Sequence, residues 1–316
     1  MRLVTAEAGV LTEILDGTYP IWGEGLSRDA YEKWNRAQME TIWGRANLRR
    51  VALTDGGRVL SSAKRYDLEA LSGGRRARVL GIGAVFTDPS LRGQGHAAAL
   101  VEAMIADAAA RGCELALLFS EIGAAYYERL GFHVIAQRVP TIEVVRKPGA
   151  PAQLVRAGEP TDFDAIAEMA ARARHGAAFA LDRSAHFIAF MLARKRLLAG
   201  LGPAGLRSVE FFVTEEAYRA VAYVVISRGP HGVFLEDCGD CDPTGARIGA
   251  MLQVLDAREP AEPPLRCRAS IPPGLAPSQW RVLGDAPADE IMMARLLGED
   301  RAIMPSQTVY PHLDVF

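Results

Sequence analysis

The segment between Val85 and Ala98 sets the tightest limit on the fold of this chain. An apolar run ends there in a proline-containing turn, and the letters R-G-Q-G-H-A then lead into an alanine-rich stretch that continues to Arg111. A helix N-terminus carries unpaired amides and the positive end of the helix dipole, and glycines let a phosphate approach the backbone closely. The pattern therefore predicts a strand, an anion-binding loop and a helix in succession. An ordinary strand-to-helix turn is the alternative.

Hydrophobic periodicity on both sides of this segment predicts a mixture of strands and helices. In the first half of the chain the expected strands cover 2–5, 50–53, 59–68, 79–87, 115–120 and 132–139, and the expected helices cover 11–22, 28–43, 95–111 and 124–130. Ser27 suits the N-cap of the second helix, and the D-G-G sequence at 55–57 suits a hairpin turn.

The same order of elements recurs after residues 147–151, which read K-P-G-A-P and predict a linker. The second half is expected to hold strands near Leu154 and over 209–214, 220–227, 233–236 and 280–283, and helices over 164–174, 185–198, 244–257 and 289–297. We therefore expect two domains, 1–147 and 148–316. Each is expected to be a mixed, mostly antiparallel sheet flanked by helices, in the α/β (α+β) class.

Composition excludes several classes of protein. The 316 residues include 36 basic and 38 acidic side chains, a net charge of −2, so no bulk basicity favours nucleic acid. No stretch approaches the length of an uncharged apolar membrane span, and the first residues lack the apolar core of a secretory signal. The four cysteines suit a reducing cytoplasm.

Two separate motifs resemble those of the GCN5-related N-acetyltransferases (GNATs). Arg92-Gly-Gln-Gly-His-Ala97 matches the family's R/Q-x-x-G-x-G/A signature, and Tyr126-Tyr-Glu-Arg-Leu-Gly-Phe132 is similar to its Y-x-x-x-G-F segment. The resemblance covers about residues 1–145. It implies tandem GNAT-like domains, with a catalytic first lobe that uses acetyl-CoA as co-substrate and a primary amine as acceptor. The second lobe would be degenerate.

The resemblance also places the co-substrate on particular residues. It implies that the backbone of Val85, Phe86 and Thr87 pairs with the pantetheine arm, where the family's fourth strand splays from the fifth. The amides that would receive the pyrophosphate belong to Arg92, Gly93, Gln94, Gly95, His96 and Ala97. Ser120, at the end of the next strand, would also meet the co-substrate. Core packing explains Val85 equally well, because its contact would be made by the main chain.

Tyr127, four residues before Gly131, takes the family's position for the general acid. Coenzyme A leaves as a thiolate, and a phenol can protonate it and be replenished from solvent. The alternative for Tyr127 is a core aromatic on a short amphipathic helix, and its neighbour Tyr126 is expected to serve packing.

The general base stays open at this point. The strand expected over 79–87 contains no acid and no histidine. Asp67, Glu69, Glu121 and water are alternatives, as is the terminal carboxylate of Phe316 if the apolar tail over 309–316 returns to the cleft. For Asp67 and Glu69, a solvated strand end explains the residue equally well.

Cys238-Gly-Asp-Cys241 invites a metal or redox interpretation. A structural zinc site needs four ligands and only one such pair exists, so we expect ordinary thiols and no metal. Asp237, Asp240 and Asp242 are expected to form an acidic turn that is solvated or faces a cationic substrate. The segment 242–250 stands in place of the signature loop without its spacing, so the second lobe is expected to pack, shape the acceptor pocket or form a homo-oligomer.

Together these features predict a cytoplasmic, acetyl-CoA-dependent N-acetyltransferase. Its acceptor is expected to be the primary amine of a small cationic molecule, acetylated directly in a ternary complex. Nucleic acid and membrane are not expected as partners. One alternative is the same chemistry on a protein lysine or N-terminus, which predicts an open groove. The other is an acyl-CoA-binding sensor without catalysis.

Overall fold

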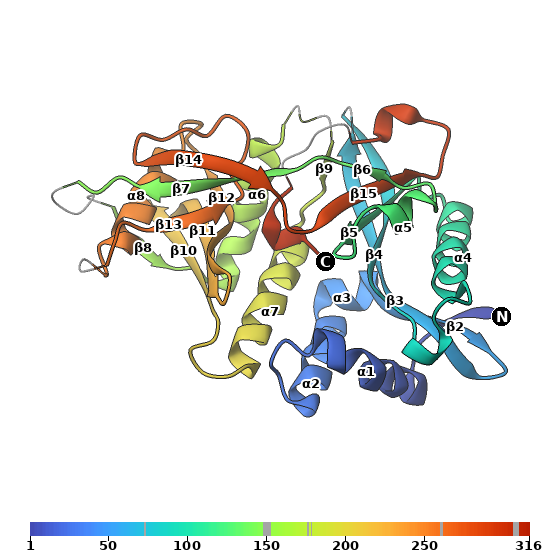
Figure 1. The fold of residues 1–316 in the computed structure, drawn as a ribbon. Helices are drawn as coiled ribbons and strands as arrows, with labels where there is room; N and C mark the ends of the chain where they lie inside the picture. Colours follow the sequence, from blue (N-terminus) through green and yellow to red (C-terminus); the bar gives the residue numbers. More distant parts are fainter. Residues whose placement is uncertain (73, 148–152, 176, 178, 260–261, 306–309) are drawn as a thin grey trace.

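The computed structural model describes the chain except residues 73, 148–152, 176, 178, 260–261 and 306–309. Two sheets lie side by side, each flanked by helices, and α7 (Ala185–Leu201) runs between them (Figure 1). The expected α/β class with two mostly antiparallel sheets is confirmed. Of the linker expected at 147–151, only Lys147 lies within the described residues.

The first sheet has eight strands. Their order is β1-β2-β3-β4-β5-β15-β6, with β9 added beside β3. Only β4 and β5 run parallel, and α4 (His96–Ala110) makes the crossover between them. The strands are β1 (Arg2–Thr5), β2 (Leu48–Asp55), β3 (Arg58–Ser72), β4 (Arg75–Phe86), β5 (Leu115–Ser120), β6 (His133–Val134), β9 (Phe179–Leu181) and β15 (Ile291–Leu296).

Helices cover both faces of this sheet, because side chains alternate along its strands. On β5, Ala116 and Leu118 pack with α4, whereas Leu115 and Leu117 share a core with Phe187 and its neighbours on α7. The remaining helices of this lobe are α1 (Ala8–Trp22), α2 (Arg28–Glu40), α3 (Ile42–Asn47) and α5 (Ala125–Glu128). Among the described residues, no helix is both long and apolar enough to cross a membrane.

The helix expected over 28–43 is divided in two. Ser27 caps α2 as predicted, since its hydroxyl accepts from the Ala30 amide at 3.2 Å. Thr41 then adopts an extended conformation and its hydroxyl accepts from the Gly44 amide at 2.9 Å. A second N-cap inside the periodic stretch therefore starts α3 as a separate helix.

The second sheet has seven strands in the order β14-β7-β13-β12-β11-β10-β8. Helix α8 (Ala246–Asp256) packs on one face, and α6 (Phe163–Ala173) lies on the other with α7. The strands are β7 (Arg138–Val144), β8 (Val155–Ala157), β10 (Ser208–Glu216), β11 (Arg219–Gly229), β12 (Gly232–Asp240), β13 (Arg266–Ala269) and β14 (Trp280–Pro287).

The two sheets exchange strands. β7, which ends before Lys147, pairs with β13 and β14 of the second sheet, and β15, near the C-terminus, pairs with β5 and β6 of the first. The helix expected over 289–297 is therefore wrong, because six residues of β15 pair with β5 and this pairing overrides local helix propensity. The boundary between 1–147 and 148–316 stays a prediction. Each sheet contains strands from both sides of it.

Candidate active site

β4 and β5 separate at the centre of the first lobe. Their parallel pairing runs from Val79 and Leu115 to Ile82 and Leu118, but β4 continues to Phe86. A β-bulge against β3 falls between Gly83 and Phe86, where Ala84 has a φ of 48°. A bulge bends its strand, so this end of β4 diverges from β5 and a wedge opens between them. The structure thus places Val85 and Phe86 on the part of β4 that has left β5.

A loop with unpaired amides follows the wedge. Gly93 and Gly95 have φ values of 78° and 80°, a region that favours glycine, and a Cβ atom on either would face open space. The Arg92 amide, which was also expected to receive the pyrophosphate, donates to the Pro89 carbonyl at 3.4 Å. In the described chain, the amides of residues 93–98 donate to no protein acceptor. The first amide beyond them that does is that of Ala99, which donates to the Gly95 carbonyl at 3.0 Å. Six successive free amides at a helix N-terminus form a cradle that fits a pyrophosphate.

Hydrogen bonds within residues 87–92 hold the shape of this cradle. Arg92 donates through Nε to the Thr87 carbonyl at 3.2 Å, which ties the loop to the end of β4. Asp88 accepts from the Ser90 amide at 2.9 Å and so fixes the turn between β4 and the loop. The loop is therefore ordered by its own side chains, while its amides are left available for a ligand.

The corresponding loop of the second lobe has no such cradle. Asp242 accepts from the Thr244 amide at 2.9 Å, and Asp240 accepts from the Arg247 amide at 3.0 Å. The Ala246 amide donates to the Thr244 hydroxyl at 3.3 Å. The chain's own carboxylates thus occupy the start of α8, where they would repel a phosphate.

A cavity of about 310 Å³ lies beside the wedge. Val85, Ser120 and Tyr127, three of the predicted site residues, line it together. Phe86, Thr87 and the loop do not line it; Phe86 instead packs on Trp22, with ring centroids 6.4 Å apart. The structure therefore separates the loop of free amides from the cavity, and Val85 on the diverging end of β4 lines the cavity a few residues before the loop begins.

Tyr127 is nearly buried on α5, with 7% of its surface exposed. Its ring meets those of Tyr126 and Phe132 edge-on, at centroid distances of 5.0 and 6.0 Å. Burial, with smaller contributions from Tyr126 and Glu121, raises the pKa of Tyr127 to about 12. The phenol is therefore protonated at neutral pH and available as a proton donor.

Only two of the carboxyl groups suggested as the base line this cavity. Asp67 forms an ion pair with Arg65 at 2.9 Å, and Glu69 pairs with Arg76 at 3.3 Å; neither lines the cavity. Glu121 and Phe316 both do. The expected return of the tail is seen in Figure 1, where the C-terminus lies at the centre of the molecule between the lobes.

Phe316 is held against β3, β4 and β5. Its ring packs on Tyr66 and Phe119, with centroids 4.6 and 5.3 Å away. A Cβ atom on Gly83 would lie 3.3 Å from the carbonyl carbon and oxygen of Phe316, so a side chain there would press on the end of the tail.

Several cavity residues had no signal in the sequence. Arg194 and Lys195 come from α7, Glu290 from the turn before β15, and His312 from the tail. A motif spanning a few residues cannot find them, since three distant segments supply them. The periodicity over 185–198 predicted a helix but did not indicate that its side chains would line the active site.

His312 is oriented by a buried carboxylate. Its Nδ1 lies 2.5 Å from Glu236, which also accepts from Lys195 at 3.0 Å and Ser227 at 2.5 Å. Burial alone would raise the pKa of Glu236, but the charges of Lys195 and His312 outweigh it and lower the pKa to about 2. This cluster fixes the tail against β12 beside the cavity.

The acidic turn expected around the cysteines is wrong in part. Asp237 and Asp240 lie within β12, and they pair with Arg183 at 2.7 Å and Arg247 at 3.1 Å. These carboxylates are therefore neutralised within the second lobe and do not line the cavity. Among the described residues all four cysteines are free, and no cluster of three or more His, Cys, Asp or Glu could hold a metal ion.

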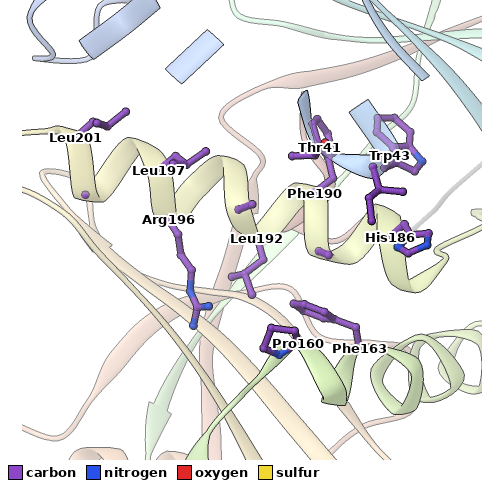
Figure 2. Close-up of a pocket in the computed structure, with 14 residues that line it drawn as sticks. Thr41, Trp43, Pro160, Phe163, His186, Phe190, Leu192, Arg196, Leu197 and Leu201 are labelled. Atoms are coloured by element: carbon purple, nitrogen blue, oxygen red, sulfur yellow. The ribbon is translucent and has the colours of Figure 1, made fainter. Parts of the chain in front are cut away.

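A second cavity, of about 710 Å³, lies along α7 (Figure 2). Leu192 and Arg196 point from the helix toward Pro160 and Phe163, and Trp43 lies on the opposite side. Its lining includes His186 and Arg196, but none of the residues of the wedge or of the loop with free amides belongs to it. The cavity with Tyr127 is therefore the candidate active site.

Comparison with known proteins agrees with this assignment. Residues 21–135 match the family model described as an acetyltransferase (GNAT) domain. No curated protein matches the chain.

Solved structures share the fold of nearly the whole chain. A probable N-acyltransferase from Enterococcus faecalis superposes with a TM-score of 0.68 at 14% identity, over 96% of this chain and 73% of that one. A GCN5-related N-acetyltransferase from Anabaena variabilis gives 0.65 at 13%, over 94% and 73%. Eis1 from Mycobacterium abscessus gives 0.57 at 15%, over 94% and 74%. At these identities the likeness shows the fold, including its two-lobed form.

Proposed function

We propose that this chain, whose first lobe carries a GNAT acetyltransferase domain, is an acetyl-CoA-dependent N-acetyltransferase acting on a small molecule with a primary amine. The observation that carries the proposal is the wedge between β4 and β5. The end of β4 contributes Val85 to the cavity that holds the protonated Tyr127, and it leads along the chain to the six free amides at the start of α4. A binding loop and a proton donor near the same strand end are what acyl transfer from a phosphorylated thioester requires.

The residues take separate roles in this proposal. The amides of residues 93–98 bind the pyrophosphate, and the backbone of Val85 offers hydrogen bonds to the pantetheine arm. The Phe86 carbonyl already accepts from the Ser61 hydroxyl at 2.7 Å. Acetyl-CoA supplies the acetyl group as a thioester, which the amine attacks as the carbon–sulfur bond breaks. Tyr127 gives its phenolic proton to the departing sulfur and regains one from solvent. Because the cavity also removes water from the sulfur, the proton affinity of the thiolate rises toward that of the buried phenol.

The amine must lose a proton before it attacks, and Phe316 is our choice for accepting it. Where the chain ends at this residue, its terminal carboxylate lies in the cavity against Gly83, whereas Glu121 is exposed at the cavity edge. Adding one glycine after Phe316 should lower kcat at least 10-fold, while Glu121→Gln should change it little. The reverse result would assign the base to Glu121.

The size and charge of the cavity favour a small acceptor. A volume of about 310 Å³ suits a metabolite-sized molecule, and Glu121 and Glu290 line it with carboxylates that attract an ammonium group. A protein substrate would need an open groove. The cytoplasmic location and a homo-oligomeric state stay predictions.

The decisive test is Tyr127→Phe, with Tyr126→Phe as its matched control on the same helix. Thiol release from acetyl-CoA would be followed with a panel of primary amines. Tyr127→Phe should lower kcat by about 10²–10⁴-fold and leave acetyl-CoA binding intact, whereas Tyr126→Phe should retain most activity. A Tyr127→Phe enzyme as active as the unaltered one would refute the acid role. Binding of acetyl-CoA without turnover of any amine would favour the sensor.

A further inference from the structure

The floor of the active-site cavity carries three cationic side chains close together. Arg50 on β2 and Lys64 on β3 are directly opposite each other in the antiparallel register, and both are more than nine-tenths buried. Arg194 reaches the same cavity from α7. Like charges placed opposite each other across a sheet repel, so this arrangement costs stability unless something compensates it.

Among the described residues, no acidic side chain neutralises these charges. Arg50 donates to the Asn35 side chain at 2.7 Å, but its Nε and Nη1 atoms are buried without a partner. Lys64 donates to the Gln38 amide oxygen at 3.3 Å. Arg194 donates to the Val315 carbonyl.

These partners are all neutral. Among the described residues, no side-chain carboxylate lies within ion-pair distance of Arg50, Lys64 or Arg194. Elsewhere the same chain pairs its buried arginines: Arg183 lies between two carboxylates, at 2.7 and 2.8 Å.

Electrostatics indicates the sign of the missing partner. Burial, followed by repulsion from Arg50 and Arg194, lowers the pKa of Lys64 well below its ordinary value, and burial lowers the pKa of Arg50. A buried cation is stabilised by an anion that arrives with matching geometry. Lys64 also pairs in register with Gly83 on β4, so the cationic floor adjoins the wedge where transfer would occur.

The opposite side of the cavity has the opposite charge. Glu121 is exposed at its edge, and Glu290 is partly buried there. Glu24 also lies at the edge, but it pairs with Arg207 at 2.7 Å. One cavity therefore presents carboxylates toward solvent and buried cations at its floor. A zwitterion fits this polarity, with its amine toward the acids and its acidic group toward Arg50 and Lys64.

We propose that the acceptor is an amino carboxylate, whose carboxylate binds Arg50, Lys64 and Arg194 while its amine is acetylated. The inference rests on the proposed function and narrows its acceptor class from amines in general to amino acids and similar zwitterions. Arg50 and Lys64 act as specificity residues. They bind the acceptor and take no part in bond breaking.

The test compares matched amines that differ only in the carboxylate. Histidine with histamine, tyrosine with tyramine, and lysine with cadaverine would be assayed by thiol release from acetyl-CoA. At least one amino acid should give a higher kcat/KM than its decarboxylated partner. Lys64→Met should lower kcat/KM for that amino acid about 100-fold and leave the decarboxylated amine within about 3-fold. Equal rates for every pair, or an equal loss on both members, would overturn the inference.

A binding measurement keeps the inference testable without turnover. The thermal midpoint would be recorded in saturating coenzyme A with the Nα-acetyl form of each amino acid and with each acetylated amine. The acetylated amino acids should raise the midpoint, and Lys64→Met should abolish that rise. The absence of a rise with all of them would overturn the inference even if amines are acetylated. The shift with acetyl-CoA alone reports separately on the proposed function.

The rival occupant of the cationic floor is the carboxylate at the end of the tail. If that carboxylate is the partner of the cations, deleting Phe316 should lower the free energy of unfolding. The unaltered protein should then show no preference for amino acids over their decarboxylated amines. That pair of results would assign the three cations to the chain's own terminus and overturn the proposal.

Discussion

Replacing Gly95 with aspartate should abolish acetyl-CoA binding without unfolding the protein. The φ of 80° at Gly95 is strained for any other residue, at about 1 kcal/mol, but a Cβ atom there meets no neighbour. Gly95→Ala carries the same strain without a charge and is therefore the matched control. In the absence of ligand Gly95→Asp should be at least as stable as Gly95→Ala, because a carboxylate at the N-cap of α4 can accept from its free amides.

The size of the effect follows from the charge introduced into the cradle. A carboxylate about 5 Å from a phosphate charge costs about 3 kcal/mol at an effective dielectric constant of about 20. Affinity would then fall by a factor of roughly 200. Ligand at about 100 times its dissociation constant adds about 2.7 kcal/mol to the unaltered protein but only about 0.2 kcal/mol to Gly95→Asp.

Thermal unfolding with and without acetyl-CoA measures this difference. The midpoint should rise by about 5–10 °C in the unaltered protein and in Gly95→Ala, and by less than about 1 °C in Gly95→Asp. An unaltered rise in Gly95→Asp would refute the assignment of the pyrophosphate to this loop. No rise in the folded unaltered protein would remove the basis of the acetyltransferase proposal.

Three further outcomes are expected. Arg183→Met should lower the free energy of unfolding, measured in urea, by about 3–5 kcal/mol, because it leaves two buried carboxylates without their arginine partner. Arg172→Met, which removes an exposed ion pair, should cost less than about 1 kcal/mol. Equal losses would contradict this. Gly83→Ala should displace Phe316 and lower kcat while the thermal shift with acetyl-CoA persists, and full activity would refute the close approach. The lowered pKa of Glu236 contributes about 3 kcal/mol of stability above pH 4.5, and this contribution is lost as the pH falls to about 2. Between these pH values the free energy of unfolding should therefore fall by about 3 kcal/mol less in Glu236→Gln than in the unaltered protein. Parallel plots of the free energy of unfolding against pH would contradict this.

The parts that the sequence could predict are local ones. The glycine positions, the start of α4 and the placement of Tyr127 on a short helix depend on residues a few positions apart, where turn and cap chemistry acts. β5 was expected over 115–120 and has those bounds, because a continuous apolar run between polar segments suits a buried strand.

The parts that the sequence could not predict depend on partners far along the chain. Residues 291–296 contain good helix formers and become a strand only because β5 offers an open edge. The division of the expected strand over 132–139 into β6 and β7 has the same origin, since the two pieces join different sheets. The cationic floor was hidden because Arg50 and Lys64 meet across a register that their separate strands do not reveal.

The exchange of strands has a consequence for synthesis of the protein on the ribosome. The edge of β5 that β15 covers is made by residue 120, but its partner is not made until residue 296. During that interval a strand of sequence L-A-L-L-F-S presents unpaired backbone groups, and such an edge invites pairing with other chains. A nascent chain must therefore shield this edge while the second lobe emerges, and a truncated product that lacks β15 would expose it permanently. The second lobe thus delays completion of the first, so that the sheet bearing the catalytic wedge closes only after nearly the entire chain has been made.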